Sequence, residues 1–192
     1  MSYQHVLQED EKRELLRIAR ATLREYARTG RVPPGKPHRA SLLTNAGVFV
    51  TLHRGAALRG CVGTLHDDTP LYKAIQDMAI AAATRDTRFA PVTPDELNAL
   101  AIEISVLGDR RRIHDASELT VGTHGVCLTL GDARGLLLPQ VAAEHGWDAA
   151  AFLERVCAKA NLPDGSWRDP AAVLETFTAQ VFDEATFPPA GR

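Results

Sequence analysis

The sequence predicts an α+β protein in which helices flank a mixed or mainly antiparallel sheet. Helical stripes and strand-like runs follow one another irregularly along the 192 residues. Two pairs of strand-like runs flank short glycine-containing turns, a pattern typical of antiparallel hairpins. No strand–helix–strand series with a glycine-rich phosphate loop occurs, so the sequence disfavours a Rossmann or P-loop nucleotide-binding fold.

The first predicted helix runs from Glu9 to Arg28. Acidic residues occupy its first turn, Gly30 follows its end, and its apolar or small residues recur every three to four positions. Residues 32–37 contain three prolines, which fix the backbone and remove N–H donors, so we expect an extended connector there. The helical stripe consists of Leu15, Ile18, Ala19, Thr22, Leu23 and Tyr26.

A hairpin is predicted from residues 47–52 and 57–65, which are two β-rich runs around a short turn. Thr69 and Pro70 then open a helix that continues to about Thr84. The proline would occupy the first helical position, where a missing N–H is tolerated. The apolar face of this helix consists of Leu71, Ile75, Met78, Ala79 and Ala82.

A short helical turn and a strand come next. Thr93 and Glu96 have the spacing of a capping box, which predicts the helical turn. Residues 100–107 alternate by twos, so Glu103 and Ser105 are expected on the polar face of a strand. The apolar face would carry Leu100, Ile102, Ile104 and Val106.

The second half of the chain is predicted to contain a hairpin, two helices and a final strand. Residues 125–130 and 134–138 flank a turn, which favours the hairpin. Residues 139–145 and 148–161 have helical patterns. Residues 174–183 alternate polar and apolar side chains, which suits one strand.

Composition and charge restrict the class of protein. The length fits a single domain spanning residues 1–192, with room for two lobes. The net charge of −2 gives no electrostatic reason to expect nucleic acid or an anionic membrane. The one tight basic run, Arg110 to Arg112, is flanked by acids and is expected to be a solvated loop. No apolar stretch approaches the roughly 18 residues of a membrane span and the first twenty residues are charged, so we expect a cytoplasmic protein without a signal peptide.

No metal or cofactor is expected from the cysteines and histidines. The three cysteines are far apart and form no Cys-x-x-Cys pair, so neither a disulfide framework nor a zinc knuckle is indicated. The histidines show no i,i+4 or His-x-His spacing. The cysteines are Cys61, Cys127 and Cys157.

The segment from Leu58 to Gly63 is the most informative about chemistry. Cys61 lies between Gly60 and Gly63 on a predicted strand, so its sulfur is little shielded and a ligand or another backbone can approach closely. Arg59 would share its face and lower the pKa of the thiol by favouring the thiolate. Cys61 is therefore a candidate nucleophile. The alternative is a buried packing cysteine whose neighbouring glycines serve a bulge.

Glu103 and His124 are candidates for moving protons. His124 lies in a glycine-containing segment and is either a base or a solvated loop residue. A carboxylate that orients a histidine beside a thiol completes a nucleophilic triad. Glu103 therefore becomes a catalytic candidate if Cys61 or His124 shares its face of the sheet.

Arg59 is also a candidate for binding substrate, and four further residues are candidates for the same role. Asp86 and Arg88 follow a predicted helix end and either orient a substrate carboxylate or phosphate or form a local ion pair. Ser105 lines either a cleft or plain solvent. Gln140 stands at a helix start, where it can donate to a ligand or satisfy backbone groups.

Residues 58–63 resemble the signature LRGCIG of the AMMECR-domain family, also called AmmeMemoRadiSam system protein A. Leu58, Gly60 and Gly63 match as structural signature residues, and Val62 stands in place of the isoleucine. The resemblance extends over nearly the whole chain. Further similar segments are residues 47–52, 86–91, 103–107, 122–125, 134–141, 146–147 and 157–160.

The resemblance implies a fold and partners but no reaction. It implies a two-lobed protein whose N- and C-terminal segments share one lobe, and which accompanies a Memo-like protein and a radical SAM protein. The signature cysteine matches Cys61. Two functions follow as hypotheses: a cysteine-dependent modification enzyme, of transferase or hydrolase-like chemistry, or a non-catalytic protein-binding or regulatory module.

Overall fold

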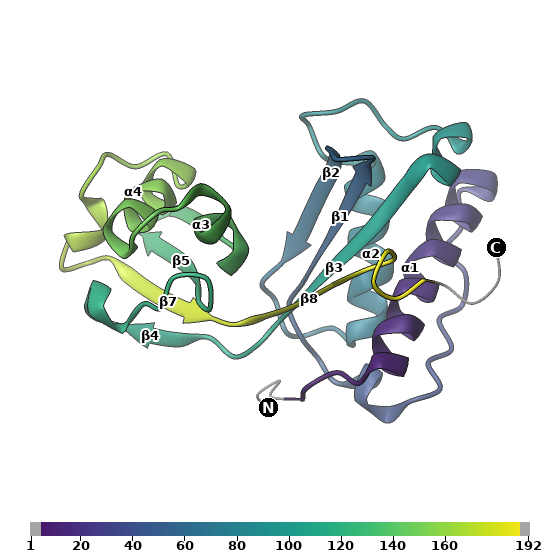
Figure 1. Cartoon of the computed structure of the whole chain (residues 1–192), viewed down its shortest axis with the longest axis horizontal. Coiled ribbons are helices and arrows are strands. Elements are labelled where there is room, and N and C mark those ends of the chain that lie inside the picture. The colour runs from purple at the N-terminus through teal and green to yellow at the C-terminus, as the bar shows by residue number, and fades with distance from the viewer. Residues whose placement is uncertain (1–4, 189–192) are drawn as a thin grey trace. The chain divides into compact units, whose positions relative to one another are not determined.

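The computed structural model describes residues 5–188 and has the predicted α+β fold. The chain divides into two compact units, each with its own four-stranded sheet (Figure 1). Unit 1 holds the chain up to Leu107 and again from Gln180 onward, and unit 2 runs from Gly108 to Ala179. Among the described residues, no helix combines the length and the apolar character needed to cross a membrane.

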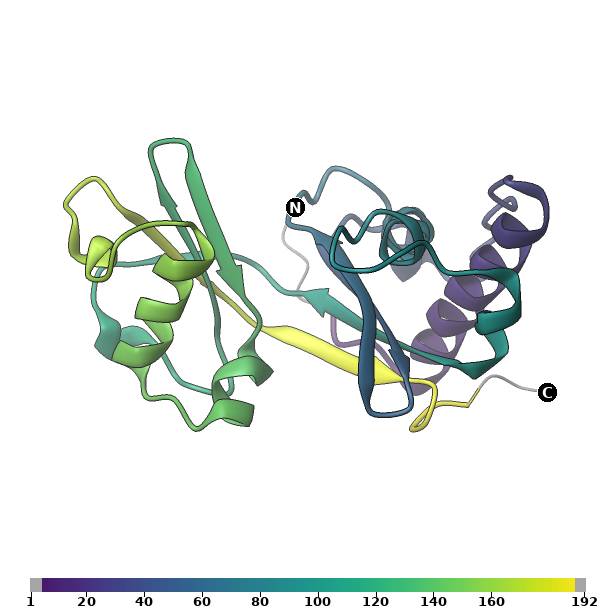
Figure 2. The ribbon, with the colours of Figure 1, turned by 90° about the horizontal axis from the view of Figure 1, so that it is seen from above.

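Unit 1 is built on a sheet with the strand order β2-β1-β3-β8, in which β1 pairs antiparallel with both β2 and β3. Helices α1 and α2 pack against each other and against this sheet (Figures 1 and 2). In chain order its elements are α1 (Glu9–Thr29), the 3-10 helix η1 (Ala40–Leu43), β1 (Val48–Arg54), β2 (Ala57–Thr64), α2 (Leu71–Thr84), the 3-10 helix η2 (Pro94–Ala99), β3 (Leu100–Leu107) and β8 (Ala179–Asp183).

The helix boundaries of unit 1 follow from local chemistry. Helix α1 ends where Gly30 adopts a left-handed conformation with φ of 70° and donates its N–H to the carbonyl of Tyr26. Thr93 and Glu96 form the predicted capping box at the start of η2. The sequence predicted Pro70 as the first helical residue of α2. In the structure Pro70 is the N-cap, and the helix begins one residue later, at Leu71.

The two faces of the unit 1 sheet differ in character. One face carries the apolar side chains of β1 and β3, which join those of α1 and α2 in a single buried cluster. Strand alternation sends the intervening side chains to the opposite face. The apolar strand residues in the cluster are Val48, Val50, Leu52, Leu100, Ile102, Ile104 and Val106.

Unit 2 has a sheet with the strand order β4-β7-β5-β6, in which each neighbouring pair is antiparallel. Helix α4 packs on β5 and β6, and Gly135 permits this because an added Cβ would lie 2.5 Å from the carbonyl oxygen of Val156. In chain order its elements are β4 (Arg111–Ile113), the 3-10 helix η3 (Ala116–Glu118), β5 (Gly125–Leu130), β6 (Ala133–Leu137), α3 (Pro139–His145), α4 (Ala149–Lys159), the 3-10 helix η4 (Ser166–Arg168) and β7 (Val173–Phe177).

Two segments differ from the sequence-based prediction. Residues 174–183 form two strands in different sheets, β7 and β8, which are separated at Thr178. The alternating pattern continues through both strands and so cannot show that the chain changes sheet. The arginine run predicted as a solvated loop contains β4, an edge strand whose arginines are exposed while Ile113 is buried against the core.

Replacing Gly60 by alanine should destabilise unit 1 strongly. The added Cβ would lie 2.2 Å from the carbonyl oxygen of Ala82 in α2, and a helix backbone cannot yield as a flexible side chain can. We expect a loss of at least about 3 kcal/mol in the free energy of unfolding, the upper part of the range for overpacking. Urea unfolding followed by circular dichroism measures this loss.

Gly55→Ala is the matched control for that experiment. Gly55 has φ of +61° and nothing within 4 Å of the added Cβ. Its replacement should therefore lower the free energy of unfolding by only roughly 1–2 kcal/mol, the cost of holding an alanine in the left-handed conformation. If both variants lose the same free energy of unfolding, the close contact between α2 and β2 at Gly60 is not what makes the Gly60 substitution destabilising.

Candidate functional site

Cys61 lies on the face of the unit 1 sheet opposite the helices. Its neighbours on β2 establish this, because Gly60 faces the Ala82 backbone in α2 and Val62 packs against the buried cluster. Side chains alternate along a strand, so Cys61 projects from the other face. We call this surface, formed by Cys61 of β2, Thr51 and His53 of β1 and Glu103 and Ser105 of β3, the Cys61 face.

Three side chains form a row across the Cys61 face. Thr51 is opposite Cys61 on one side and opposite Glu103 on the other. The N–H of Cys61 donates to Asp86 Oδ2 at 2.8 Å and so points away from β1. Cys61 and Thr51 therefore form a non-hydrogen-bonded strand pair, the kind in which side chains approach most closely. Thr51 Oγ1 accordingly donates to Cys61 Sγ at 3.2 Å.

A histidine also belongs to this face. His53 Nε2 lies 4.0 Å from Glu103 Oε2, and both side chains are partly exposed. His53 lies beyond the strand predicted from the sequence, which ends at Leu52, because β1 continues to Arg54. The alternation of Phe49, Thr51 and His53 was the signal that could have identified it.

The pKa of the Cys61 thiol is raised above its ordinary value, chiefly because partial burial removes water from the group. The hydrogen bond from Thr51 and the charge of Arg88 act in the opposite direction, and the charges of Asp86 and Glu103 reinforce the increase. Burial dominates, so Cys61 rests as a thiol at neutral pH. The sequence-based expectation of a lowered thiol pKa is therefore not supported by the structure.

Arg59 does not supply the expected charge to the thiol because its guanidinium is bound elsewhere. Its Nε donates to Glu96 Oε1 at 3.1 Å and its Nη1 donates to the carbonyl of Ala90 at 2.9 Å. The hydrogen bonds from Arg59 are the main reason that the pKa of Glu96 is lowered to about 2. Arg59 thus ties the edge strand to η2 and to the loop before it.

Asp86 and Arg88 form the local ion pair that the sequence offered as one alternative, and Asp86 also fixes the Cys61 backbone. Arg88 donates its Nε to Asp86 Oδ1 at 2.9 Å and its Nη2 to Oδ2 at 2.7 Å. These bonds, together with the one from the Cys61 N–H, hold the pKa of Asp86 well below its usual range. The Asp86 side chain is only 6% exposed, whereas that of Arg88 is 52% exposed.

Two buried polar side-chain atoms lack a hydrogen-bond partner within the described residues, and both belong to predicted binding residues. Ser105 Oγ lies on the Cys61 face, on a residue that is 1% exposed. Gln140 Oε1 lies in unit 2, in the first turn of α3. A buried polar group without a partner is costly and is often completed by a water or a ligand.

His124 belongs to unit 2, whereas Cys61 and Glu103 belong to unit 1. Its Nδ1 accepts the backbone N–H of Thr120 at 3.0 Å. In the neutral ring the proton is therefore assigned to Nε2, which acts as a donor. Within unit 1 the histidine that shares a face with Cys61 is His53.

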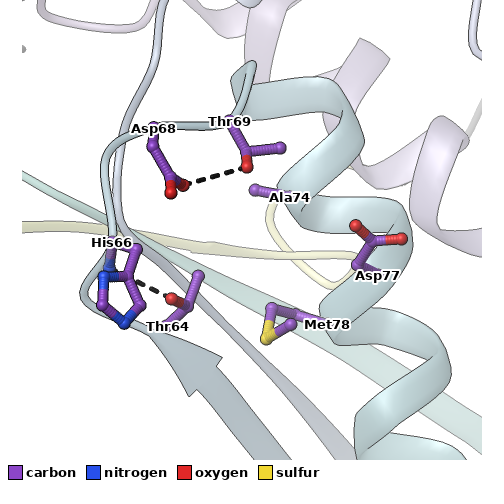
Figure 3. Close-up of a pocket in the computed structure, with 7 residues that line it drawn as sticks. All are labelled: Thr64, His66, Asp68, Thr69, Ala74, Asp77 and Met78. Atoms are coloured by element: carbon purple, nitrogen blue, oxygen red, sulfur yellow. Dashed lines mark hydrogen bonds between the residues drawn. The ribbon is translucent and has the colours of Figure 1, made fainter.

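A small pocket lies at the end of β2, on the helix side of the sheet (Figure 3). Its volume is about 170 Å³, below the roughly 300–1,000 Å³ of most ligand sites. Figure 3 shows Asp68 turned toward Thr69, with which it is hydrogen bonded. No group of three potential metal ligands occurs among residues 5–188. The lining residues are Thr64, His66, Asp68, Thr69, Ala74, Asp77 and Met78.

Comparisons with known proteins give a consistent result. The AMMECR1 family model matches residues 16–182. A protein of Methanothermobacter thermautotrophicus is 42% identical over 187 residues, which cover 93% of this chain and 96% of the relative. A protein of Pyrococcus furiosus is 43% identical over 181 residues, which cover 88% and 86%. The crystal structure of an uncharacterized protein from Pyrococcus horikoshii is 38% identical, with a TM-score of 0.84 and coverage of 88% and 89%.

Asp86→Ala should lower stability in a pH-dependent way. The change removes the acceptor of the Cys61 N–H, for which we expect a loss of about 1–3 kcal/mol near neutral pH. Because the pKa of Asp86 is lower in the folded than in the unfolded chain, its charge stabilises the fold above about pH 4, and this contribution is lost as the pH falls below that value. The stability difference between wild type and variant should therefore narrow from pH 6 to pH 2.

Urea unfolding of both proteins across this pH range measures the difference. Asp86→Asn is the control, because its amide oxygen can still accept the Cys61 N–H while the ion pair with Arg88 is lost. Its stability at pH 6 should lie between those of wild type and Asp86→Ala. A difference between wild type and Asp86→Ala that stays constant with pH would contradict the assigned role of the Asp86 charge.

Proposed function

The chain belongs to the AMMECR1 family, and from this premise we propose that it is a cysteine-dependent modification enzyme with Cys61 as its nucleophile. The observation that carries the proposal is the row on the Cys61 face, in which the thiol, Thr51 and Glu103 lie on three adjacent strands. His53 stands 4.0 Å from Glu103 on the same face. A thiol, an imidazole and a carboxylate are the groups that thiol catalysis requires.

The raised pKa of Cys61 makes a proton acceptor necessary. In the proposed reaction, the Cys61 S–H gives its proton to the His53–Glu103 pair, and the sulfur forms a bond to an electrophilic carbonyl carbon of the substrate. The leaving group departs with the proton. A second nucleophile, water or an acceptor amine or hydroxyl, then releases the acyl group and regenerates the thiol. The base predicted from the sequence, His124, belongs to unit 2, and this step does not use it.

Binding of substrate is assigned to groups that are not fully used within the fold. The side chain of Arg88 is 52% exposed and its charge acts on the Cys61 thiol, although it also pairs with Asp86. On the Cys61 face, Ser105 Oγ is buried without a partner in the described residues. Gln140 belongs to unit 2 and is not used in this site. A Memo-like protein and a radical SAM protein are the proposed partners, on the basis of family membership.

A second function, a non-catalytic protein-binding or regulatory module, is favoured by one specific observation. The groups around Cys61 are largely satisfied by one another, since Asp86 pairs with Arg88 and Arg59 pairs with Glu96. Together with a thiol whose pKa is raised, this describes a rigid surface suited to recognition. The two functions differ in whether the Cys61 sulfur forms a covalent bond.

Alkylation of the native protein should occur at Cys61 and should rise with pH around a midpoint above the ordinary thiol value of about 8.5. Burial raises the pKa of this thiol, and Cys127 and Cys157 are fully buried. Iodoacetamide labelling followed by peptide mass spectrometry measures the rate at each cysteine. A midpoint well below 8 would contradict the assigned environment of Cys61.

Cys61→Ser should abolish function while changing the free energy of unfolding by less than about 1 kcal/mol. Serine is nearly isosteric but far less nucleophilic, and Cys61 is only partly buried. Cys157→Ser is the control, because placing a hydroxyl in the unit 2 core, where Cys157 is fully buried, should cost about 1–3 kcal/mol. Thermal unfolding measures stability, and complementation of a deletion strain measures function.

A covalent adduct distinguishes the two proposed functions. Wild-type protein incubated with the Memo-like and radical SAM partners in cell extract should acquire a mass increment on Cys61, and the Ser variant should not. Retained complementation by Cys61→Ser, with no adduct on the wild type, would reject the enzyme and support the binding module.

A further inference from the structure

A β-bulge interrupts the hairpin of β1 and β2 just before Cys61. The register shifts after Leu52, and Arg59 becomes an extra residue of β2. Beyond the shift, His53 is opposite Leu58. His53 lies on the Cys61 face, and residues directly opposite each other on paired strands share a face. Simple alternation from Cys61 would instead send Leu58 to the helix side of the sheet, so the bulge brings an apolar side chain to the Cys61 face.

Leu58 is one of the few large apolar residues that stay exposed in the described chain, with 37% of its surface accessible. It borders the row of Cys61, Thr51 and Glu103 on the side of His53. Bulges are common beside active sites, where they redirect a side chain. The redirected leucine lies where a substrate held at the Cys61 sulfur would contact it.

An aromatic ring borders the same row on its other side. Phe49 is opposite Gly63, and a Cβ added to this glycine would lie 2.2 Å from the Phe49 ring. The half-buried ring therefore fills the space that a side chain on β2 would occupy at this position. Residues two apart on a strand share a face and are roughly 7 Å apart, so the ring lies beside Cys61.

A buried hydroxyl adjoins the ring. Ser105 is opposite Phe49 on β3, and its Oγ is the atom without a hydrogen-bond partner within the described residues. Such a group is completed by a water or a ligand, because leaving it unpaired is costly. The surface around the thiol thus combines apolar side chains with a few polar groups, which is the usual composition of a site for an organic ligand.

We infer that Leu58 and Phe49 select a substrate with apolar groups on both sides of the carbonyl that Cys61 attacks. This inference rests on the proposed function and adds the class of its substrate. The two side chains lie on opposite sides of Cys61 along β2, so each contacts the substrate on one side of the reacting carbon. Removing apolar surface from water on both sides holds that carbon at the sulfur. The hydroxyl of Ser105 is available to a polar atom of the substrate beside the ring.

Alkylation of Cys61 in the full-length protein tests the inference with two reagents, iodoacetamide and its apolar analogue N-benzyl-iodoacetamide. Peptide mass spectrometry gives the rate of each reagent at Cys61, and N-acetylcysteine corrects for their intrinsic reactivities. The corrected rates should favour the benzyl reagent about tenfold in the wild type. Leu58→Ala and Phe49→Leu should each lower this preference about threefold, because each removes apolar surface that the benzyl group contacts. Leucine keeps an apolar side chain over Gly63, and thermal unfolding verifies that both variants are folded.

Val181→Ala is the matched control. Val181 is 43% exposed and projects to the Cys61 face, since its neighbour Phe182 belongs to the buried cluster, but β8 lies at the opposite edge of the sheet from β2. Its replacement should leave the preference unchanged. A wild type without the preference, or an equal loss in the control, would overturn the inference. A preference kept by Leu58→Ala or by Phe49→Leu would overturn the assignment of that residue. These outcomes do not depend on complementation by Cys61→Ser, which tests the proposed function separately.

Discussion

The contact between the backbone of α2 and Gly60 of β2 is the constraint on which unit 1 depends. Because β2 has no side chain at this position, the carbonyl of Ala82 can lie against the strand. The same contact assigns one face of the sheet to the helices and sends Cys61 to the other. Gly63 acts similarly on that second face, where an added Cβ would lie 2.2 Å from the Phe49 ring. The two glycines of the signature thus allow close contacts on opposite faces of one strand, Gly60 with the backbone of α2 and Gly63 with the Phe49 ring.

Burial has a larger effect on the pKa of the Cys61 thiol than the neighbouring charges have. Arg88 and the hydroxyl of Thr51 favour the thiolate, but burial and the carboxylates of Asp86 and Glu103 favour the thiol. The position of the sulfur is instead fixed through the main chain, since Asp86 accepts the Cys61 N–H at the open edge of β2. Such an arrangement orients a neutral thiol, and reactivity then depends on a neighbouring proton acceptor and not on a permanently lowered pKa.

The elements of the fold were largely predictable because their signals are local. The stripe of α1, the β1–β2 hairpin and the capping box of η2 depend on residues a few positions apart, and all three occur as predicted. The change of sheet at Thr178 was not predictable, because alternation reports that a segment is extended and not which strand lies beside it. His53 was missed for a smaller reason, a strand end placed two residues early.

The sequence by itself determined the family and the fold class and made Cys61 the candidate on which the proposed chemistry rests, since these are contained in short patterns of residue type. Only the tertiary structure decided how the charged groups pair. Arg59 is bound by Glu96 and not by the thiol, and Arg20 is buried against Glu184, 164 residues away. Of three adjacent arginines, Arg110 is bound to Glu175 and Arg111 to Glu118. The physical reason is that an ion pair depends on the distance between two side chains, and folding sets that distance by bringing remote segments together.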